Sequence, residues 1–283
     1  MRNYNIRSNL SLPEIKKLTI IHNTYKTQRT KINYDFNKYL IDKYCIFNKQ
    51  DNFWNLFNKL DGIVDLSDPD TSMPNSLHAL QTAEAMRKQD RPDWMILTGL
   101  IHDMGKILYT FGCSEDGTSI DTQWSLVGDT FITGTKLPND LILSEYNKYN
   151  LDHINNINKY QENCGLEACS VSFGHDEYLY RLLKYNNHKL PLEAEYMIRY
   201  HSLYAWHSGT SYDYLENDID KQLKSWVKDF NKYDLYTKDD TNIIKWTDEL
   251  KEYYSTLNSL VCLTNPASLA TRLIFSNIML RNL

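Results

Sequence analysis

The stretch LIHDMGK, residues 100–106, places a histidine and an aspartate side by side in a strongly apolar segment. Burying His102 and Asp103 without partners would cost free energy, and two apolar residues would pack there more easily. Neighbouring side chains on a helix point about 100° apart, but both can lean toward one large object such as a metal centre. Lys106, four residues after His102, would extend over the same side of the helix. The ordinary alternative is a hydrogen-bonded core histidine beside a capping aspartate.

The sequence around this stretch predicts a mostly helical protein. Prolines at helix starts and apolar residues at helical spacing predict helices over 75–88, 93–111, 192–206 and 225–236. The segment SLVGDTFITG (125–134) is the one attractive candidate for a strand. We therefore expect an all-α fold, a single helical bundle with few or no strands.

The composition argues against several functional classes. The 283 residues carry a formal net charge of −5 with acids and bases interspersed, and they show no basic face or motif for nucleic acid. The N-terminus is polar, and no apolar run is long enough to span a bilayer. The five cysteines form no CxxC pair, which predicts reduced thiols rather than a structural zinc site. We expect a cytoplasmic protein that binds neither nucleic acid nor membranes.

Further polar side chains lie in equally apolar surroundings on separate predicted helices. His78 lies in SLHALQ, His175 in a second His–Asp dipeptide, His201 in RYHSLY and Asp234 in KYDLY. With the first His–Asp pair, these residues make six candidate ligands on five helices. Six ligands are too many for one zinc ion but suit two metals that share a carboxylate. Imidazole and carboxylate ligands favour iron, manganese or a related ion over a thiolate-type site.

Longer segments around these residues resemble the myo-inositol oxygenases, a family of helical HD-domain di-iron enzymes. The resemblance runs from about Arg2 to about Tyr254. It divides the chain into an oxygenase-like HD-domain over 1–261 and a divergent apolar tail over 262–283. The segments that carry the resemblance are LDGIVDLSDPDTSMPNSLHALQTAE, GLIHDMGK, WSLVGDTF, GHDEYLY, MIRYHS and FNKYDLYTK.

The resemblance implies two iron ions per chain, as a mixed-valent Fe(II)/Fe(III) pair in the active form. Asp103 would be the carboxylate that bridges them. The implied ligands are His78, His102, Asp103 and Asp234 for one iron, and Asp103, His175 and His201 for the other.

The family resemblance also implies an activity, in which myo-inositol and dioxygen are converted to D-glucuronate and water. The substrate would chelate the second iron through two neighbouring hydroxyls. Lys106 would be catalytic, because its ammonium can stabilise a substrate alkoxide or, when neutral, accept the hydroxyl proton. The implied substrate contacts are Arg2, Asp65, Gly128, Asp129, His201, Ser202 and Lys238.

Two rival functions remain open on the sequence. An HD-type metal-dependent phosphohydrolase could use Lys106, Lys238 and Arg2 to bind phosphate, but Asp65 and Asp129 would repel it. A degenerate, non-enzymatic HD protein has no chemical reason to keep a complete ligand set. We favour the oxygenase, and we expect it to be a monomer.

The C-terminal tail has an unusual composition. From residue 253 to residue 283 there is no Asp, Glu or Lys. The apolar residues of the tail predict a single helical stripe that packs on the core or on another chain. The residues of this stripe are Leu269, Leu273, Ile274, Phe275, Ile278 and Met279.

Overall fold

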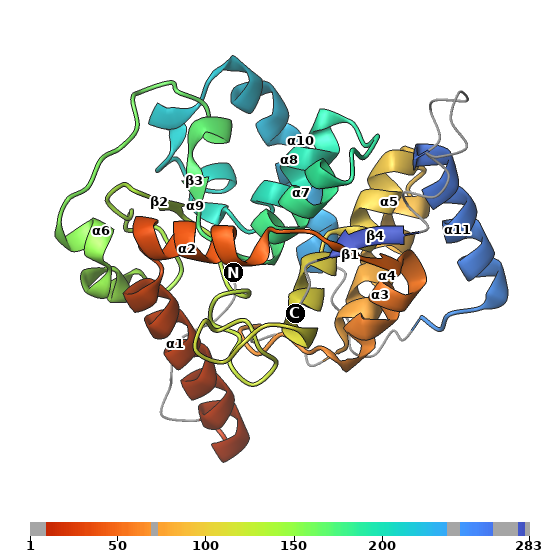
Figure 1. Cartoon of the computed structure of the whole chain (residues 1–283), viewed down its shortest axis with the longest axis horizontal. Coiled ribbons are helices and arrows are strands. Elements are labelled where there is room, and N and C mark those ends of the chain that lie inside the picture. Colours follow the sequence, from red (N-terminus) through yellow and green to blue (C-terminus); the bar gives the residue numbers. More distant parts are fainter. Residues whose placement is uncertain (1–9, 69–72, 237–243, 263–276, 281–283) are drawn as a thin grey trace.

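The computed structural model describes residues 10–68, 73–236, 244–262 and 277–280. The described chain is mostly helical, with four short strands, which confirms the predicted all-α class (Figure 1). None of its described helices is both long and apolar enough to cross a membrane.

The α-helices have the following bounds: α1 Leu12–Lys31, α2 Tyr34–Tyr44, α3 Phe53–Lys59, α4 Asn75–Arg87, α5 Asp93–Ile101, α6 Leu151–Ile154, α7 His175–Tyr185, α8 Leu192–Tyr200, α9 Tyr204–His207, α10 Asp218–Tyr236 and α11 Asp248–Cys262. The 3-10 helices are η1 Leu60–Gly62, η2 Met104–Thr110, η3 Ser144–Tyr149, η4 Leu166–Ala168 and η5 Asp213–Leu215. The strands are β1 Lys49–Asn52, β2 Ile132–Thr133, β3 Ser170–Val171 and β4 Asn277–Leu280.

Local sequence signals explain where several helices begin. Asn33 caps α2 by accepting hydrogen bonds from the backbone amides of Asp35 and Phe36, both at 3.1 Å. Pro74, Pro92 and Pro191 immediately precede α4, α5 and α8. The φ angle of proline suits the start of a helix. Proline also lacks an amide hydrogen, but no helix hydrogen bond is lost, because the first amides of a helix have no partner within it.

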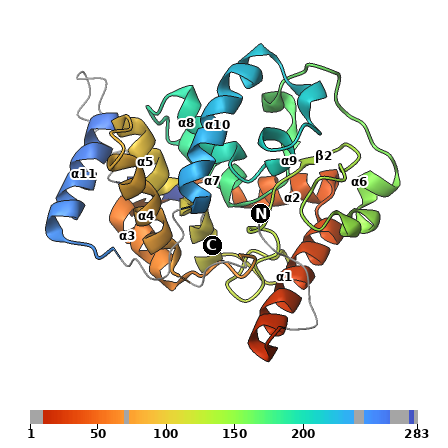
Figure 2. The same cartoon turned by 180° about the vertical axis from the view of Figure 1, so that it is seen from behind.

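Five helices form the centre of the molecule and support the site described below. Helix α4 packs on α5, α7 on α8, and α10 on both α8 and α4. Figure 1 shows α3, α4, α5 and α11 at one end, and α1, α2 and α6 at the other. Figure 2, seen from behind, shows α8 and α10 side by side. The main apolar core lies between α4, α5, α7 and α8, and includes Leu80, Leu100, Leu179 and Ile198.

Two helices that were predicted as continuous are broken in the structure. The helix predicted over 93–111 ends as α5 at Ile101, and a 3-10 helix begins at Met104. Gly105 explains the change, because a Cβ atom there would lie 1.8 Å from the carbonyl oxygen of His175. The helix predicted over 192–206 likewise stops at Tyr200 and resumes as α9. Both breaks place a histidine at the end of a helix.

The strands differ in part from the sequence prediction. Within the predicted strand 125–134, only Ile132–Thr133 forms β2, which pairs antiparallel with β3. Strand β4 pairs antiparallel with β1, so Ile278 and Met279 lie in a strand, and the predicted helical stripe is wrong at these positions. A short apolar segment can pair with a free strand edge as readily as it can extend a helix. The other residues of the predicted stripe lie outside the described residues.

Candidate metal centre

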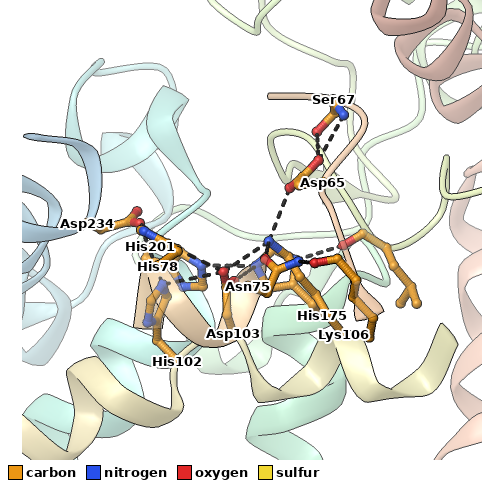
Figure 3. A network of polar contacts seen from close by, with 12 residues as sticks. Asp65, Ser67, Asn75, His78, His102, Asp103, Lys106, His175, His201 and Asp234 are labelled. Carbon is orange, nitrogen blue, oxygen red and sulfur yellow. Dashed lines mark hydrogen bonds and ion pairs between the residues drawn. The ribbon is translucent and has the colours of Figure 1, made fainter. Parts of the chain in front are cut away.

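Six buried histidine and aspartate side chains from five helices meet at the centre of the bundle (Figure 3). His78 comes from the middle of α4, and Asp234 comes from α10. His102 caps the end of α5, and Asp103 follows it. The remaining two are His175, the first residue of α7, and His201, which caps the end of α8. Each of the six residues is at most 4% exposed.

The carboxylate of Asp103 stands between two groups of ligands. Its Oδ2 lies 3.9 Å from Nε2 of His78 and 3.7 Å from Nε2 of His102. Its Oδ1 lies 3.2 Å from Nε2 of His175. Asp234 belongs to the first group, because its Oδ1 lies 2.9 Å from Nε2 of His78 and 3.5 Å from Nε2 of His102. One oxygen of Asp103 therefore faces each group.

Backbone carbonyls orient three of the imidazole rings. Nδ1 of His102 lies 2.8 Å from the carbonyl oxygen of Gly99, Nδ1 of His175 2.7 Å from that of Leu126, and Nδ1 of His201 2.9 Å from that of Ile198. Because a carbonyl only accepts, each Nδ1 must carry the proton, which leaves the Nε2 lone pair for a ligand. Metal-binding histidines are commonly held in this way.

The arrangement of the nitrogens fits metal ions. The Nε2 atoms of His175 and His201 lie 3.1 Å apart, and two lone pairs at that distance repel unless a cation or a proton lies between them. Within the described part of the chain, the buried Nε2 of His102 has no hydrogen-bond partner. Two described groups could each hold an ion, namely His78–His102–Asp103 and Asp103–His175–His201. Nitrogen and carboxylate donors suit iron, manganese or zinc.

The electrostatics of the centre keep two of the candidate ligands, Asp103 and His201, in states that can bind metal. Burial opposes ionisation of Asp103, but the charges of Lys106 and His102 outweigh it and hold the pKa of Asp103 well below its usual value. Burial, together with His175 and His102, lowers the pKa of His201 to about 3. At neutral pH, Asp103 is therefore a carboxylate and His201 a neutral imidazole.

Lys106 lies beside the candidate metal centre, and its Nζ donates to three acceptors. Its Nζ donates to Oδ2 of Asp103 at 3.0 Å, to Oδ1 of Asn75 at 2.9 Å and to Oδ2 of Asp65 at 3.1 Å (Figure 3). Burial lowers the pKa of Lys106, but the two carboxylates outweigh it and raise the pKa above its usual value. Lys106 thus forms an ion pair with Asp103, three residues earlier in the chain.

A polar pocket joins Lys106 to the metal-binding groups. Its wall contains the candidate ligands Asp103, His175, His201 and Asp234 together with Lys106. Four predicted substrate contacts line it, namely Asp65, Gly128, Ser202 and His201, the last of which is also a candidate ligand. Gly128 has φ +88°, and a Cβ atom there would lie 3.2 Å from the ring of Tyr25, so this position requires glycine.

Asp129, another predicted substrate contact, is bound by other parts of the chain. Asp129 is buried, and its Oδ1 accepts a hydrogen bond from Nη2 of Arg29 at 2.6 Å while its Oδ2 accepts one from the amide of Ile142 at 3.0 Å. A substrate contact through this carboxylate would have to compete with Arg29. Arg2 and Lys238 lie outside the described residues.

Four residues of this region were missed by the sequence analysis. Tyr25, Ser67 and Tyr204 line the pocket, and Asn75 binds Lys106. Asn75 could have been found, because it precedes His78 by three residues and residues at that spacing share a helix face. Tyr25 lies on α1, far from the motifs in sequence, and no local signal distinguishes it from a core tyrosine.

Comparisons with known proteins agree with this geometry. The sequence model of the family described as myo-inositol oxygenase matches residues 18–263. An inositol oxygenase of Danio rerio is 39% identical over 253 residues, covering 86% of each chain. One of Homo sapiens is 39% identical over 250 residues, covering 86% of this chain and 84% of its own. One of Dictyostelium discoideum is 39% identical over 254 residues, covering 84% of this chain and 83% of its own.

Proposed function

The chain belongs to the myo-inositol oxygenase family, and from this premise we propose that it cleaves the ring of myo-inositol with dioxygen to give D-glucuronate and water. In this reaction one oxygen atom of dioxygen enters the product and the other leaves as water. The observation that supports the proposal most strongly is the position of Asp103, which turns one carboxylate oxygen toward each of two buried ligand groups.

We propose two iron ions as the cofactor, a mixed-valent Fe(II)/Fe(III) pair in the active form. His78, His102 and Asp234 would bind one iron, and His175 and His201 would bind the other. Asp103 would bind both. The iron pair supplies the redox chemistry of dioxygen, for which the described pocket offers no side chain.

The remaining pocket residues would bind and orient the substrate. The ammonium of Lys106 would donate a hydrogen bond to the hydroxyl that reacts and stabilise its alkoxide form, because Lys106 lines the same pocket as the candidate ligands. Asp65 and Ser202 would hydrogen-bond other hydroxyls of the polyol. Gly128 would let the backbone come close to the substrate, and the burial of the ligands limits the access of water.

The phosphohydrolase alternative is weaker on this geometry. Lys106 is the cation in the described pocket wall, and the carboxylates of Asp65 and Asp103 already offset its charge. A dianionic phosphate would meet Asp65 directly. Asp129 would not repel a phosphate strongly, because its charge is paired with that of Arg29.

We also propose that the protein is a cytoplasmic monomer. Cys113, Cys164 and Cys169 form no disulfide in the described structure, which accords with a reducing compartment.

Oxygen uptake by iron-loaded protein tests the proposed reaction. We expect myo-inositol to cause uptake of dioxygen and to give an equal amount of D-glucuronate. A nucleoside phosphate under the same conditions is the control and should release no phosphate. Phosphate release without oxygen uptake would favour the phosphohydrolase.

A further inference from the structure

A buried ion pair joins α7 and α8 close to the two histidines of the second ligand group. Glu177 follows His175 by two residues on α7, and Arg199 precedes His201 by two residues on α8. Glu177 is fully buried and Arg199 is 3% exposed. The pair therefore sits on the two helices that carry Nε2 atoms 3.1 Å apart.

The contacts of Arg199 allow its guanidinium little movement. Nε donates to Oε2 of Glu177 at 2.7 Å, and Nη2 contacts Oε1 of the same residue at 3.3 Å. Nη1 donates to Oε2 of Glu167 at 2.7 Å and to the hydroxyl of Tyr200 at 3.0 Å. The guanidinium carbon lies 4.4 Å from the centre of the Tyr180 ring. Such a two-pronged contact fixes both distance and direction.

Stability alone does not explain a charged pair at this place. Removing two charges from water costs several kcal/mol, and an apolar pair of similar volume is often as stable or more so. Apolar packing alone, however, allows small sliding movements between helices, whereas a site needs its ligands held within about 0.5 Å. A change of this size would matter for two nitrogens that must bind one ion.

We infer that Arg199 and Glu177 are positioning residues, which set α7 against α8 so that His175 and His201 can bind the second metal ion. This inference rests on the proposed two-metal centre. It predicts an effect on the second ion and not on the ion bound by His78 and His102, because those ligands come from α4 and α5.

The double variant Glu177→Leu/Arg199→Met tests the inference, since it replaces the ion pair by apolar residues of similar size. The chain offers a matched control on the same two helices. Lys184 of α7 and Glu195 of α8 form a partly exposed ion pair at 3.0 Å, further from the histidines. Lys184→Met removes that pair and leaves the contact of Glu195 with His188 in place.

Metal-free protein is titrated with Fe(II) or Mn(II) under anaerobic conditions by calorimetry, and thermal unfolding is recorded for each variant. We expect the Glu177/Arg199 double variant to stay folded. It should keep the wild-type affinity for the ion bound by His78 and His102, while its affinity for the ion bound by His175 and His201 falls by about tenfold or more. The control should bind both ions like the wild type. Arg199→Lys keeps the charge but loses the two-pronged contact, so it should weaken the second site even if the double variant does not fold.

Three results would overturn the inference. The first is wild-type affinity for both ions in the double variant, or in Arg199→Lys if the double variant does not fold. This result would refute the positioning role but not the two-metal centre. A wild-type stoichiometry of one ion would refute the two-metal centre and this inference with it. An equal loss of both affinities would also contradict it, because a general structural defect would then explain the data.

Discussion

Lys106 and Asp103 are joined by a buried hydrogen bond of 3.0 Å that ends on Oδ2, the carboxylate oxygen that faces His78 and His102. The ammonium of Lys106 and the carboxylate that we propose as the metal bridge are therefore in direct contact. This contact holds the Lys106 ammonium in the pocket wall, where it would donate a hydrogen bond to a hydroxyl group of the substrate.

Lys106→Ala should retain both metals but lose turnover by about 10²–10³-fold, because it removes an ammonium that stabilises the substrate alkoxide and not a ligand. Iron content and kcat are measured on the same preparation. Lys43→Ala is the control, since Lys43 pairs with Asp116 away from the pocket. A nearly normal rate at saturating substrate would rule out the catalytic role of Lys106.

Asp103→Asn should impair metal binding more than Asp234→Asn. Asp103 faces both ligand groups, whereas the contacts of Asp234 are to His78 and His102 in the first group. Elemental analysis after iron loading should show loss of both ions in the first variant and preferential loss of one in the second. An Asp103→Asn protein that keeps two ions would contradict the bridge.

The metal-free protein should lose stability in acid partly through His207. Burial lowers the pKa of this histidine to about 4, so the folded state binds fewer protons than the unfolded state below about pH 6.5. Stability is therefore present above about pH 6.5 and is lost as the pH falls. His207 should account for about 2 kcal/mol of the loss between about pH 7.5 and pH 5.

Urea unfolding at the two pH values checks this effect. In His207→Gln the amide can still donate to the carbonyl of His201, which Nε2 of His207 contacts at 3.0 Å, but it cannot titrate. The free energy of unfolding of the variant should depend less on pH than that of the wild type. Equal pH dependence would mean that His207 does not contribute.

Truncation after Val261 tests the proposed boundary between the domain and the tail. It removes β4 and hence its pairing with β1, so the melting temperature should fall by a few degrees, given about 1 kcal/mol for each net hydrogen bond. Iron content and turnover per site should stay near those of the full chain. A folded truncated protein that cannot bind iron would show that the tail helps to build the site.

Several of the candidate ligands could be predicted because they interrupt an apolar helix pattern. His78 and Asp234 are polar residues on helical apolar faces, which local spacing detects. The ends of the helices at His102 and His201 could not be predicted in this way. They depend on tertiary packing, such as the close approach of Gly105 to the backbone of His175.

Long-range partners explain the other differences from the sequence prediction. The carboxylate of Asp129 is bound by Arg29, which lies 100 residues earlier on α1. No local sequence pattern predicts this pair. The strand at 277–280 depends in the same way on residues 49–52, which supply its partner edge. Such pairs form only when the chain has folded, so the local periodicity of the sequence cannot predict them.

The central claim is that two iron ions share the carboxylate of Asp103. Anaerobic iron loading, followed by iron analysis and electron paramagnetic resonance of the half-oxidised protein, tests it most directly. We expect two irons per chain and the signal of an exchange-coupled Fe(II)/Fe(III) pair, with both lost in Asp103→Asn. One tightly bound ion per chain, or two irons without magnetic coupling, would contradict the claim.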